Sequence, residues 1–175
     1  MKRVAVIASA SGCGKTTFGR SLSERLDVPL VELDALNHVG PDWVEATPDE
    51  LRAKVEPIVA TDSWVIDGSY RSKLGDLVVE RAEVIVWLDL PVHVWLPRLA
   101  RRTLTRILRR EELWGGNRET LRNVLFSRDS LIVFALRNYR LRRRRYPVQL
   151  ARFDLVRLRS QREIEAFLKS VVPET

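Results

Sequence analysis

The feature that most constrains this chain is the glycine-rich stretch of residues 9–17, which reads SASGCGKTT. It follows a short apolar run and leads into a helix-like segment, which is the strand and helix context of a phosphate-binding P-loop. Gly14, Lys15 and Thr16 supply the ending of that motif. Its first position normally holds glycine, whereas this chain has Ser9, and the sequence leaves open whether Ser9 is tolerated or weakens nucleotide binding.

Each residue type in this stretch has a role in binding a nucleoside triphosphate. Glycines let successive backbone N–H groups turn toward phosphate oxygens, and the following helix N-terminus adds a favourable dipole. Lys15 is expected to reach the β- and γ-phosphates, and the Thr16 hydroxyl is expected to bind Mg²⁺. We therefore predict ATP and Mg²⁺ as cofactors. The predicted nucleotide-binding residues of the loop are Ser9, Ala10, Ser11, Gly12, Cys13, Gly14, Lys15, Thr16 and Thr17.

The length and cysteine content indicate one domain in a reducing compartment. A chain of 175 residues with 45% apolar residues is long enough to bury a single core. Its one cysteine, Cys13, excludes an internal disulfide and a four-cysteine zinc site, which is compatible with a cytoplasmic location. Residues 1–10 superficially resemble a signal peptide, but we assign them to the strand that leads into the P-loop and expect no export signal. The later apolar stretch of residues 84–96 is too short and too interrupted to cross a bilayer.

Positive charge is concentrated in one region of the chain. The formal net charge is +7, and residues 98–152 hold 16 arginines against four acidic residues. Such a region suits polyphosphate capture, contact with nucleic acid or contact with an acidic surface, and composition alone does not rank these.

The alternation of apolar runs and amphipathic segments predicts the fold class. Strands are expected at residues 3–8, 29–34, 63–67, 84–89 and 153–158, and helices at 15–26, 48–60, 74–81, 91–108, 120–139 and 162–171. This order predicts a three-layer α/β/α sandwich with a five-stranded parallel sheet. Ligands bind beyond the carboxyl ends of such strands, so we expect Ser9, Asp34, Asp67 and Asp89 to lie at one edge of the sheet.

Five segments of this chain carry a resemblance to a known family. They are SASGCGKTT, VELDALNHVGPDW, WVIDGSYR, VIVWLDLP and RLARRTLTR. Together they resemble the P-loop proteins known as DNA topology modulation proteins, which look like relatives of adenylate kinase. The likeness covers nearly the whole chain, although only the P-loop is specific by itself. It implies a single P-loop kinase-like domain over residues 1–175, with a helical arginine-rich lid at about residues 98–145.

The segment Asp67-Gly68-Ser69-Tyr70-Arg71 is similar to the D-G-F-P-R motif of adenylate kinases. By that likeness Asp67 would hold Mg²⁺ through water, and Arg71 would bind the anionic group of the acceptor or the transferring phosphoryl group. Ser69 and Tyr70 stand where the motif has Phe and Pro, so an AMP-type acceptor is not implied.

Asp34, His38 and Trp43 match the pattern by which the family lines its acceptor pocket. The resemblance implies that Asp34 accepts a proton from the acceptor hydroxyl, with coordination of Mg²⁺ as a second possibility. The predicted substrate-binding residues are Asp34, His38, Trp43, Asp67 and Arg71.

The pair Arg98 and Arg102 has the i, i+4 spacing of paired arginines at the lid entrance of nucleoside monophosphate kinases. The resemblance implies that they grip polyphosphate or stack on the base. Neighbouring arginines leave the choice among them open: Arg101, Arg106, Arg109 and Arg110. Arg159 falls where relatives place the loop that contacts adenine, so it is carried over as a nucleotide-binding residue.

These residues favour a kinase that transfers the γ-phosphoryl group of Mg·ATP to a nucleoside, a nucleotide or another small hydroxyl compound. The predicted catalytic residues are Lys15, Asp34, Arg71, Arg98 and Arg102. A second hypothesis is a nucleotide-dependent protein that binds nucleic acid through the basic run of residues 140–145. A third is a P-loop ATPase without an acceptor. The sequence predicts no membrane partner and gives no oligomeric state.

Overall fold

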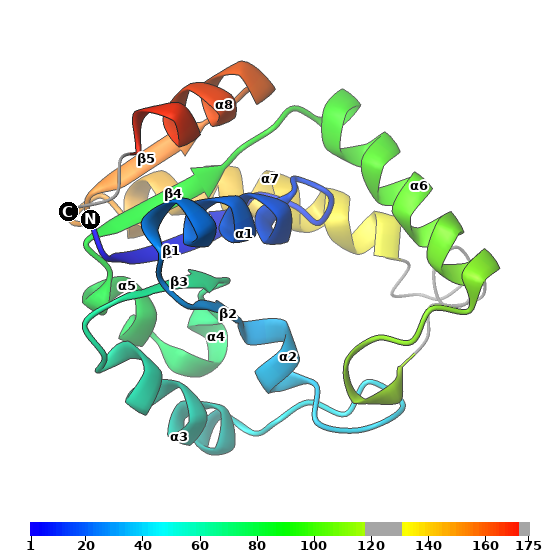
Figure 1. The fold of residues 1–175 in the computed structure, drawn as a ribbon. Helices are drawn as coiled ribbons and strands as arrows, with labels where there is room; N and C mark the ends of the chain where they lie inside the picture. Colours follow the sequence, from blue (N-terminus) through cyan, green and yellow to red (C-terminus); the bar gives the residue numbers. More distant parts are fainter. Residues whose placement is uncertain (118–130, 172–175) are drawn as a thin grey trace.

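In the computed structural model, which describes residues 1–117 and 131–171, five parallel strands form one sheet. The strands are β1 (Arg3–Ala8), β2 (Leu30–Glu32), β3 (Trp64–Asp67), β4 (Val84–Leu88) and β5 (Leu155–Leu158). Their order across the sheet is β2-β3-β1-β4-β5, which places the first strand in the centre. Helices cover both faces of the sheet (Figure 1), and the predicted three-layer α/β/α sandwich with a five-stranded parallel sheet is confirmed.

The central strand is buried on both faces because its side chains alternate between two cores. Val4 and Val6 pack into one core, and Ala5 and Ile7 pack into the other. The first core is covered by α1 (Lys15–Leu26) and α8 (Gln161–Ser170), and the second by α3 (Pro48–Val59) and α5 (Leu77–Arg81). The carboxyl end of the sheet is thereby held rigidly between two helical layers.

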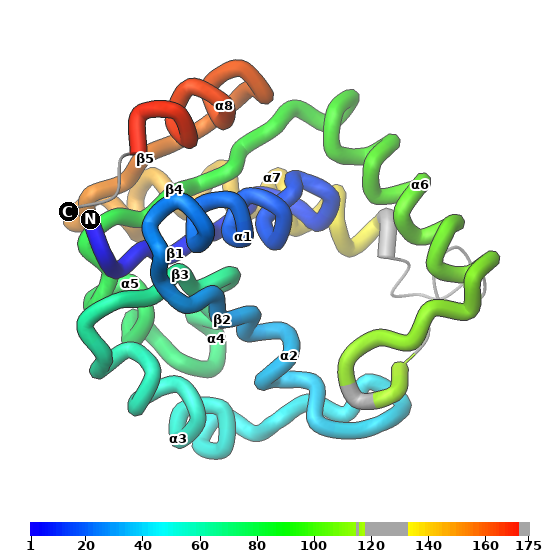
Figure 2. Tube along the Cα trace, in the orientation of Figure 1, coloured from blue at the N-terminus to red at the C-terminus, as the bar shows by residue number. Residues whose placement is uncertain are grey.

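The remaining elements surround that end of the sheet. They are α2 (Leu33–Asn37), α4 (Arg71–Leu74), α6 (Val92–Arg109), η1 (Trp114–Gly116) and α7 (Leu131–Gln149). Figure 2 shows the segment after α2 beside the segment that contains η1. The Asn117 side chain joins them, since it accepts a hydrogen bond from the Trp43 backbone at 2.6 Å and donates one to the Gly40 carbonyl at 2.9 Å. Among the described helices, none is long and apolar enough to cross a membrane.

Two predicted boundaries near the site are wrong. The strand predicted at residues 29–34 ends at Glu32, which pairs with Asp67, the last residue of β3. Since no partner strand continues beyond that pair, the chain turns into α2, and Asp34 lies in its first turn. The helix predicted at residues 74–81 is divided into α4 and α5 at Gly75, whose φ is 59°.

The helix predicted at residues 120–139 is longer at its carboxyl end than the sequence indicated. Residues 120–130 lie outside the described part of the chain, and α7 continues to Gln149 through the whole basic run. Arginine has a high helix propensity, so the run is compatible with a continuous helix.

Candidate functional site

The P-loop, residues 9–14, connects β1 to α1. Gly12 and Gly14 have φ values of 88° and 85°, in the left-handed region that favours glycine. A Cβ atom on Gly12 would also lie 2.6 Å from the Trp95 carbonyl oxygen, so this position has no room for a side chain. Cys13 is buried within the loop, and burial raises the pKa of its thiol above the ordinary value. The loop conformation therefore depends on both glycines.

Lys15 and Thr16 begin α1, and both contact Asp67 at the end of β3. The Lys15 Nζ lies 2.5 Å from Asp67 Oδ1, and the Thr16 hydroxyl donates to Asp67 Oδ2 at 2.6 Å. Parallel pairing of β1 with β3 places Asp67 beside Val6, which brings it next to the loop that leaves β1. Asp67 is only 4% exposed, so these two partners satisfy a carboxylate that would be costly to bury alone.

The Thr16 hydroxyl and the Asp67 carboxylate are oxygen donors of the kind that Mg²⁺ prefers. Within residues 1–117 and 131–171, no group of three or more His, Cys, Asp or Glu side chains forms a metal site. Protein-bound Mg²⁺ commonly uses one or two carboxylates together with waters and substrate phosphates. The pair therefore fits an ion that arrives with a nucleotide.

Ser9, the departure from the P-loop motif, is fully buried and faces away from the phosphate-binding side of the loop. Its φ is not positive, so this position does not require glycine. The hydroxyl donates to Asp89 Oδ1 at 2.6 Å and accepts from the Trp87 indole N–H at 2.9 Å. Ser9 thus connects the base of the P-loop to the end of β4.

Asp89 joins this connection to two further elements. Arg157 of β5 donates to Asp89 Oδ2 from Nε at 3.0 Å and from Nη2 at 2.5 Å. The Nε of Arg143, from α7, lies 3.1 Å from the same oxygen. The Asp89 side chain is completely buried, and its charge is compensated by both guanidinium groups. The base of the P-loop is therefore held by β4, β5 and α7 together.

The basic run of residues 140–145 faces partly inward. Arg142 donates to the Ala8 carbonyl at 3.2 Å, and Arg143 donates to the Tyr139 hydroxyl at 2.8 Å as well as pairing with Asp89. These two arginines support the P-loop, so the run presents fewer outward cations than its sequence indicates.

A cavity of about 1290 Å³ extends from the P-loop to the segment after β2. The predicted site residues on its wall are Ala10, Ser11, Gly12, Cys13, Gly14, Lys15, Thr16, Thr17, Asp34, His38, Trp43, Arg71, Arg98 and Arg102. Ser9, Asp67 and Arg159 are not part of this wall, and near Arg159 the wall is formed by Gln161 instead. The structure therefore brings the predicted nucleotide and acceptor residues into one space.

Tyr70, to which the sequence assigned no role, contacts Asp34 in this cavity. Its hydroxyl donates to Asp34 Oδ1 at 2.6 Å. Burial, reinforced by the charge of Asp34, raises the pKa of Tyr70 far above its ordinary value, so the phenol remains a donor at neutral pH. The signal in the sequence was an aromatic residue where the related motif has proline.

Lys73 is a second residue of this region to which the sequence assigned no role. Its Nζ lies 2.7 Å from each of three oxygens, on Asn37, Glu45 and the Ala46 backbone. An ammonium group has three protons, and each has an acceptor here. The hydrogen bond from Lys73 holds the pKa of Glu45 below its usual value. Lys73 thereby ties α4 to the segment that follows α2.

His38 and Trp43, both predicted to bind the acceptor, lie together, and a second indole lies beside them. The ring centroids of His38 and Trp43 are 5.5 Å apart in a T-shaped arrangement, and Trp114 of η1 stacks on His38 at 6.0 Å. All three residues line the cavity. They form an aromatic wall at the end of the cavity away from the P-loop, where the acceptor residues were predicted.

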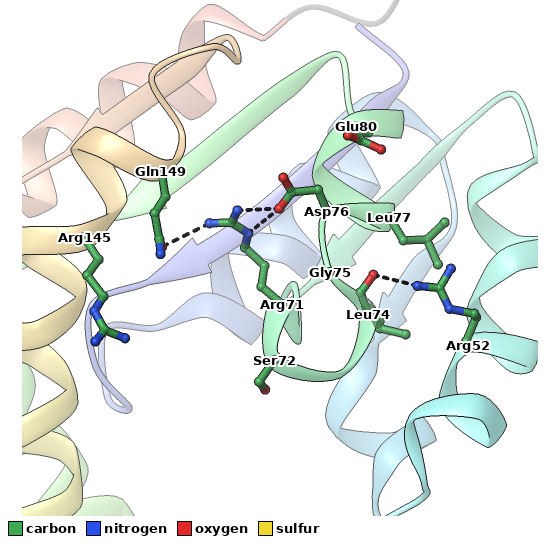
Figure 3. A pocket seen from close by; sticks show the side chains of 10 residues that line it. All are labelled: Arg52, Arg71, Ser72, Leu74, Gly75, Asp76, Leu77, Glu80, Arg145 and Gln149. Atoms are coloured by element: carbon green, nitrogen blue, oxygen red, sulfur yellow. Dashed lines mark hydrogen bonds and ion pairs between the residues drawn. The ribbon is translucent and has the colours of Figure 1, made fainter.

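Arg71 reaches the rim of the cavity but is engaged elsewhere. Its Nε donates to Asp76 Oδ1 at 2.7 Å, and its Nη1 donates to Gln149 Oε1 at 3.1 Å (Figure 3). A role for Arg71 at the acceptor requires it to leave Asp76, and that role stays a prediction.

Arg98 and Arg102 both line the cavity from α6, as their spacing predicts. Arg98 also donates to Gln161 Oε1 at 3.3 Å, and Arg106 lies on the same wall. The other arginines of this region are not part of the wall: Arg101, Arg109 and Arg110. The α6 helix therefore presents a row of three cations to the cavity.

No family model matches the sequence, and one curated relative does. The uncharacterized protein YqaC of Bacillus subtilis (strain 168) is 28% identical over 67% of this chain, and the match spans 66% of that relative, just under two thirds of its length.

Solved structures share the fold over nearly the whole chain. A gluconokinase from Sinorhizobium meliloti 1021 is 21% identical, with 96% of this chain and 91% of that chain covered and a TM-score of 0.53. A shikimate kinase from Acinetobacter baumannii, in complex with shikimate, is 14% identical, with coverage of 97% and 90% and a TM-score of 0.59. A deoxyadenosine kinase from M. mycoides is 9% identical, with coverage of 95% and 97% and a TM-score of 0.53. This chain has a P-loop kinase fold. Identities this low establish the P-loop kinase fold alone, and the resemblance to the topology modulation family stays a prediction.

Proposed function

We propose that this protein is a small-molecule kinase that transfers the γ-phosphoryl group of Mg·ATP to a hydroxyl acceptor. The proposal rests on one cavity with Lys15 and Thr16 at one end and the Asp34–Tyr70 pair at the other. Phosphoryl transfer depends mainly on positioning two substrates in line and neutralising charge. The P-loop kinase fold supports this chemistry, and the different acceptors named for its solved relatives leave the acceptor open.

We assign each side chain a role according to its position along the cavity. Lys15 binds the β- and γ-phosphates, and Thr16 with Asp67 holds Mg²⁺, which when bound neutralises phosphate charge. Tyr70 orients the Asp34 carboxylate through its hydrogen bond to Oδ1, and Asp34 accepts the proton from the acceptor hydroxyl.

The remaining predicted residues complete this proposal. His38, Trp43 and Arg71 line the acceptor end, and Arg98 and Arg102 stabilise charge on the transferring group. Arg159 is proposed to contact the nucleotide base. We propose one domain over residues 1–175, with an arginine-rich lid at about residues 98–145 and a reducing, cytoplasmic setting.

Two alternatives stay predictions. Binding of nucleic acid would rely on residues 140–145, but Arg142 and Arg143 are engaged with the P-loop base. A P-loop ATPase without an acceptor would use the phosphate end of the cavity alone.

Incubation with Mg·ATP and a panel of nucleosides, nucleotides, sugars and sugar acids tests the proposal. We expect acceptor-dependent release of ADP and a phosphorylated product detected by mass spectrometry. Asp34→Asn should lower turnover about 10²- to 10⁴-fold, the usual loss for a general base. Asp42→Asn is the matched control, because Asp42 is exposed and lies outside the cavity wall. Equal ADP release with and without every acceptor would refute the kinase and support the ATPase.

A further inference from the structure

A second cavity, of about 680 Å³, adjoins the acceptor end of the first. Arg71, Ser72, Arg145 and Gln149 lie on the walls of both, so the two spaces meet between α4 and α7. Figure 3 shows Arg145 and Gln149 projecting from α7 on one side and Arg71 and Ser72 on the other. An acceptor bound at Asp34 can therefore extend toward α7.

Most cations near this junction already have partners. Arg71 is paired with Asp76 and bonded to Gln149, and Arg52 donates to the Leu74 carbonyl at 3.2 Å and pairs with Glu56 at 3.2 Å. At the acceptor end, all three protons of Lys73 have acceptors. None of these groups is available to a ligand without breaking an internal contact.

Arg145 differs from them. Within the described residues its guanidinium group has no hydrogen bond or ion pair, and in Figure 3 no dashed line ends on it. It is exposed on the wall of both cavities. A guanidinium group offers a planar fork of donors that matches a carboxylate or a phosphate bidentately.

We propose that Arg145, rather than Arg71, binds an anionic group of the acceptor, which is therefore a hydroxyl compound that also carries a carboxylate or a phosphate. The inference rests on the proposed kinase function. Asp34 brings negative charge to the acceptor end, so the hydroxyl of the acceptor faces Asp34 and its anion faces Arg145 of α7.

Matched pairs of acceptors that differ in the anion test this inference. Gluconate with glucitol probes a carboxylate, and ribose 5-phosphate with ribose probes a phosphate. For at least one pair, we expect the wild type to phosphorylate the charged member with a kcat/KM at least about 10-fold higher than that of the neutral member. This is the ratio expected from one charge-assisted hydrogen bond.

Arg145→Ala should then raise the KM of the charged acceptor about 10- to 100-fold, without changing the KM of ATP or the rate with the neutral member. The KM of the charged acceptor for Arg145→Lys should lie between the values for the wild type and for Arg145→Ala. Arg144→Ala is the control, because the adjacent arginine is exposed and lines neither cavity.

The outcomes separate the two proposals. Equal use of charged and neutral acceptors, or equal losses in Arg145→Ala and Arg144→Ala, would overturn the inference and leave the kinase standing. Phosphorylation of no acceptor of either kind would overturn the proposed function itself.

Discussion

The two ends of the large cavity are built in different ways. The phosphate end is built around the consecutive residues 10–17, and Asp67 of β3 contacts both Lys15 and Thr16. The acceptor end combines α2, the residue before α4, η1 and α7. The proposed nucleotide site is thus encoded locally, whereas the proposed acceptor site depends on how remote segments pack.

The ends also differ in what supports them. Behind the phosphate end lie the buried Ser9 and Asp89, and Asp89 is paired with Arg143 and Arg157. The acceptor end is joined by hydrogen bonds of single side chains, of which Lys73 and Asn117 are described above. Changes at the first end should therefore affect every substrate, and changes at the second should affect the acceptor alone.

At the phosphate end, the largest expected effect is that of Lys15→Ala. Loss of the phosphate-binding ammonium group should lower kcat/KM about 10²- to 10³-fold with every acceptor, as for other donors that stabilise a charged transition state. Steady-state kinetics with ATP and each active acceptor measures this. Lys169→Ala, an exposed change on α8, should have no effect. A loss confined to one acceptor would contradict the local character of the phosphate end.

Ser9→Ala tests the support behind the P-loop. It leaves the Trp87 indole and Asp89 without their common partner, so the free energy of unfolding should fall by about 1–3 kcal/mol. We also expect weaker binding of Mg·ATP, measured by calorimetry. Ser9→Gly should likewise lower both the free energy of unfolding and the affinity for Mg·ATP. Stability and affinity equal to those of the wild type would show that the hydroxyl is dispensable.

Tyr70→Phe probes the acceptor end. Without the hydrogen bond to Asp34 Oδ1, the carboxylate is less well oriented, and kcat should fall about 10-fold while the KM of ATP stays constant. Tyr146→Phe is a suitable comparison, because Tyr146 also lines the cavity but packs against Trp87 and makes no hydrogen bond with Asp34. A parallel rise in the KM of ATP would mean that the two ends are not separable.

Tyr70 also predicts a pH dependence of stability. Its pKa is raised in the folded state, so the unfolded chain releases this proton first as the pH rises through about 10. The folded state then loses up to about 1.4 kcal/mol per pH unit relative to the unfolded state. Urea unfolding between pH 9 and 11 should show a shallower decline in Tyr70→Phe, and identical slopes would contradict the assignment.

The smallest expected effect is that of Asn117→Ala. It removes the hydrogen bonds that join η1 to Trp43 and Gly40, which loosens the aromatic wall. The KM of the acceptor should rise about threefold, with the KM of ATP unchanged, because each such bond contributes modestly. If Asn117→Ala lowered kcat/KM for the acceptor more than Tyr70→Phe does, the proposed ranking of these two residues at the acceptor end would be wrong.

The sequence predicted what local chemistry determines. The P-loop glycines, the parallel sheet and the start of α3 follow from neighbouring residues, and Thr47 and Glu50 form a capping box at that helix start. The predicted end of the second strand, at Asp34, is wrong because the end of β2 is set by its pairing with β3.

The missed contacts all join distant positions. Tyr70 meets Asp34 across 36 residues, and Lys73 meets Asn37 across the same interval. No periodicity or motif reports such a pairing, since it depends on how α4 packs against α2. The role of Ser9 was equally hidden, because its partner Asp89 lies 80 residues away.

The Ser9–Asp89 contact has an evolutionary consequence. A glycine at position 9 would remove a hydroxyl on which a buried carboxylate depends, so we expect the two positions to vary together. Among homologous chains, those with the usual glycine at the first P-loop position are expected to lack the carboxylate after β4, or to supply another donor to it. An alignment in which positions 9 and 89 vary independently would contradict this linkage.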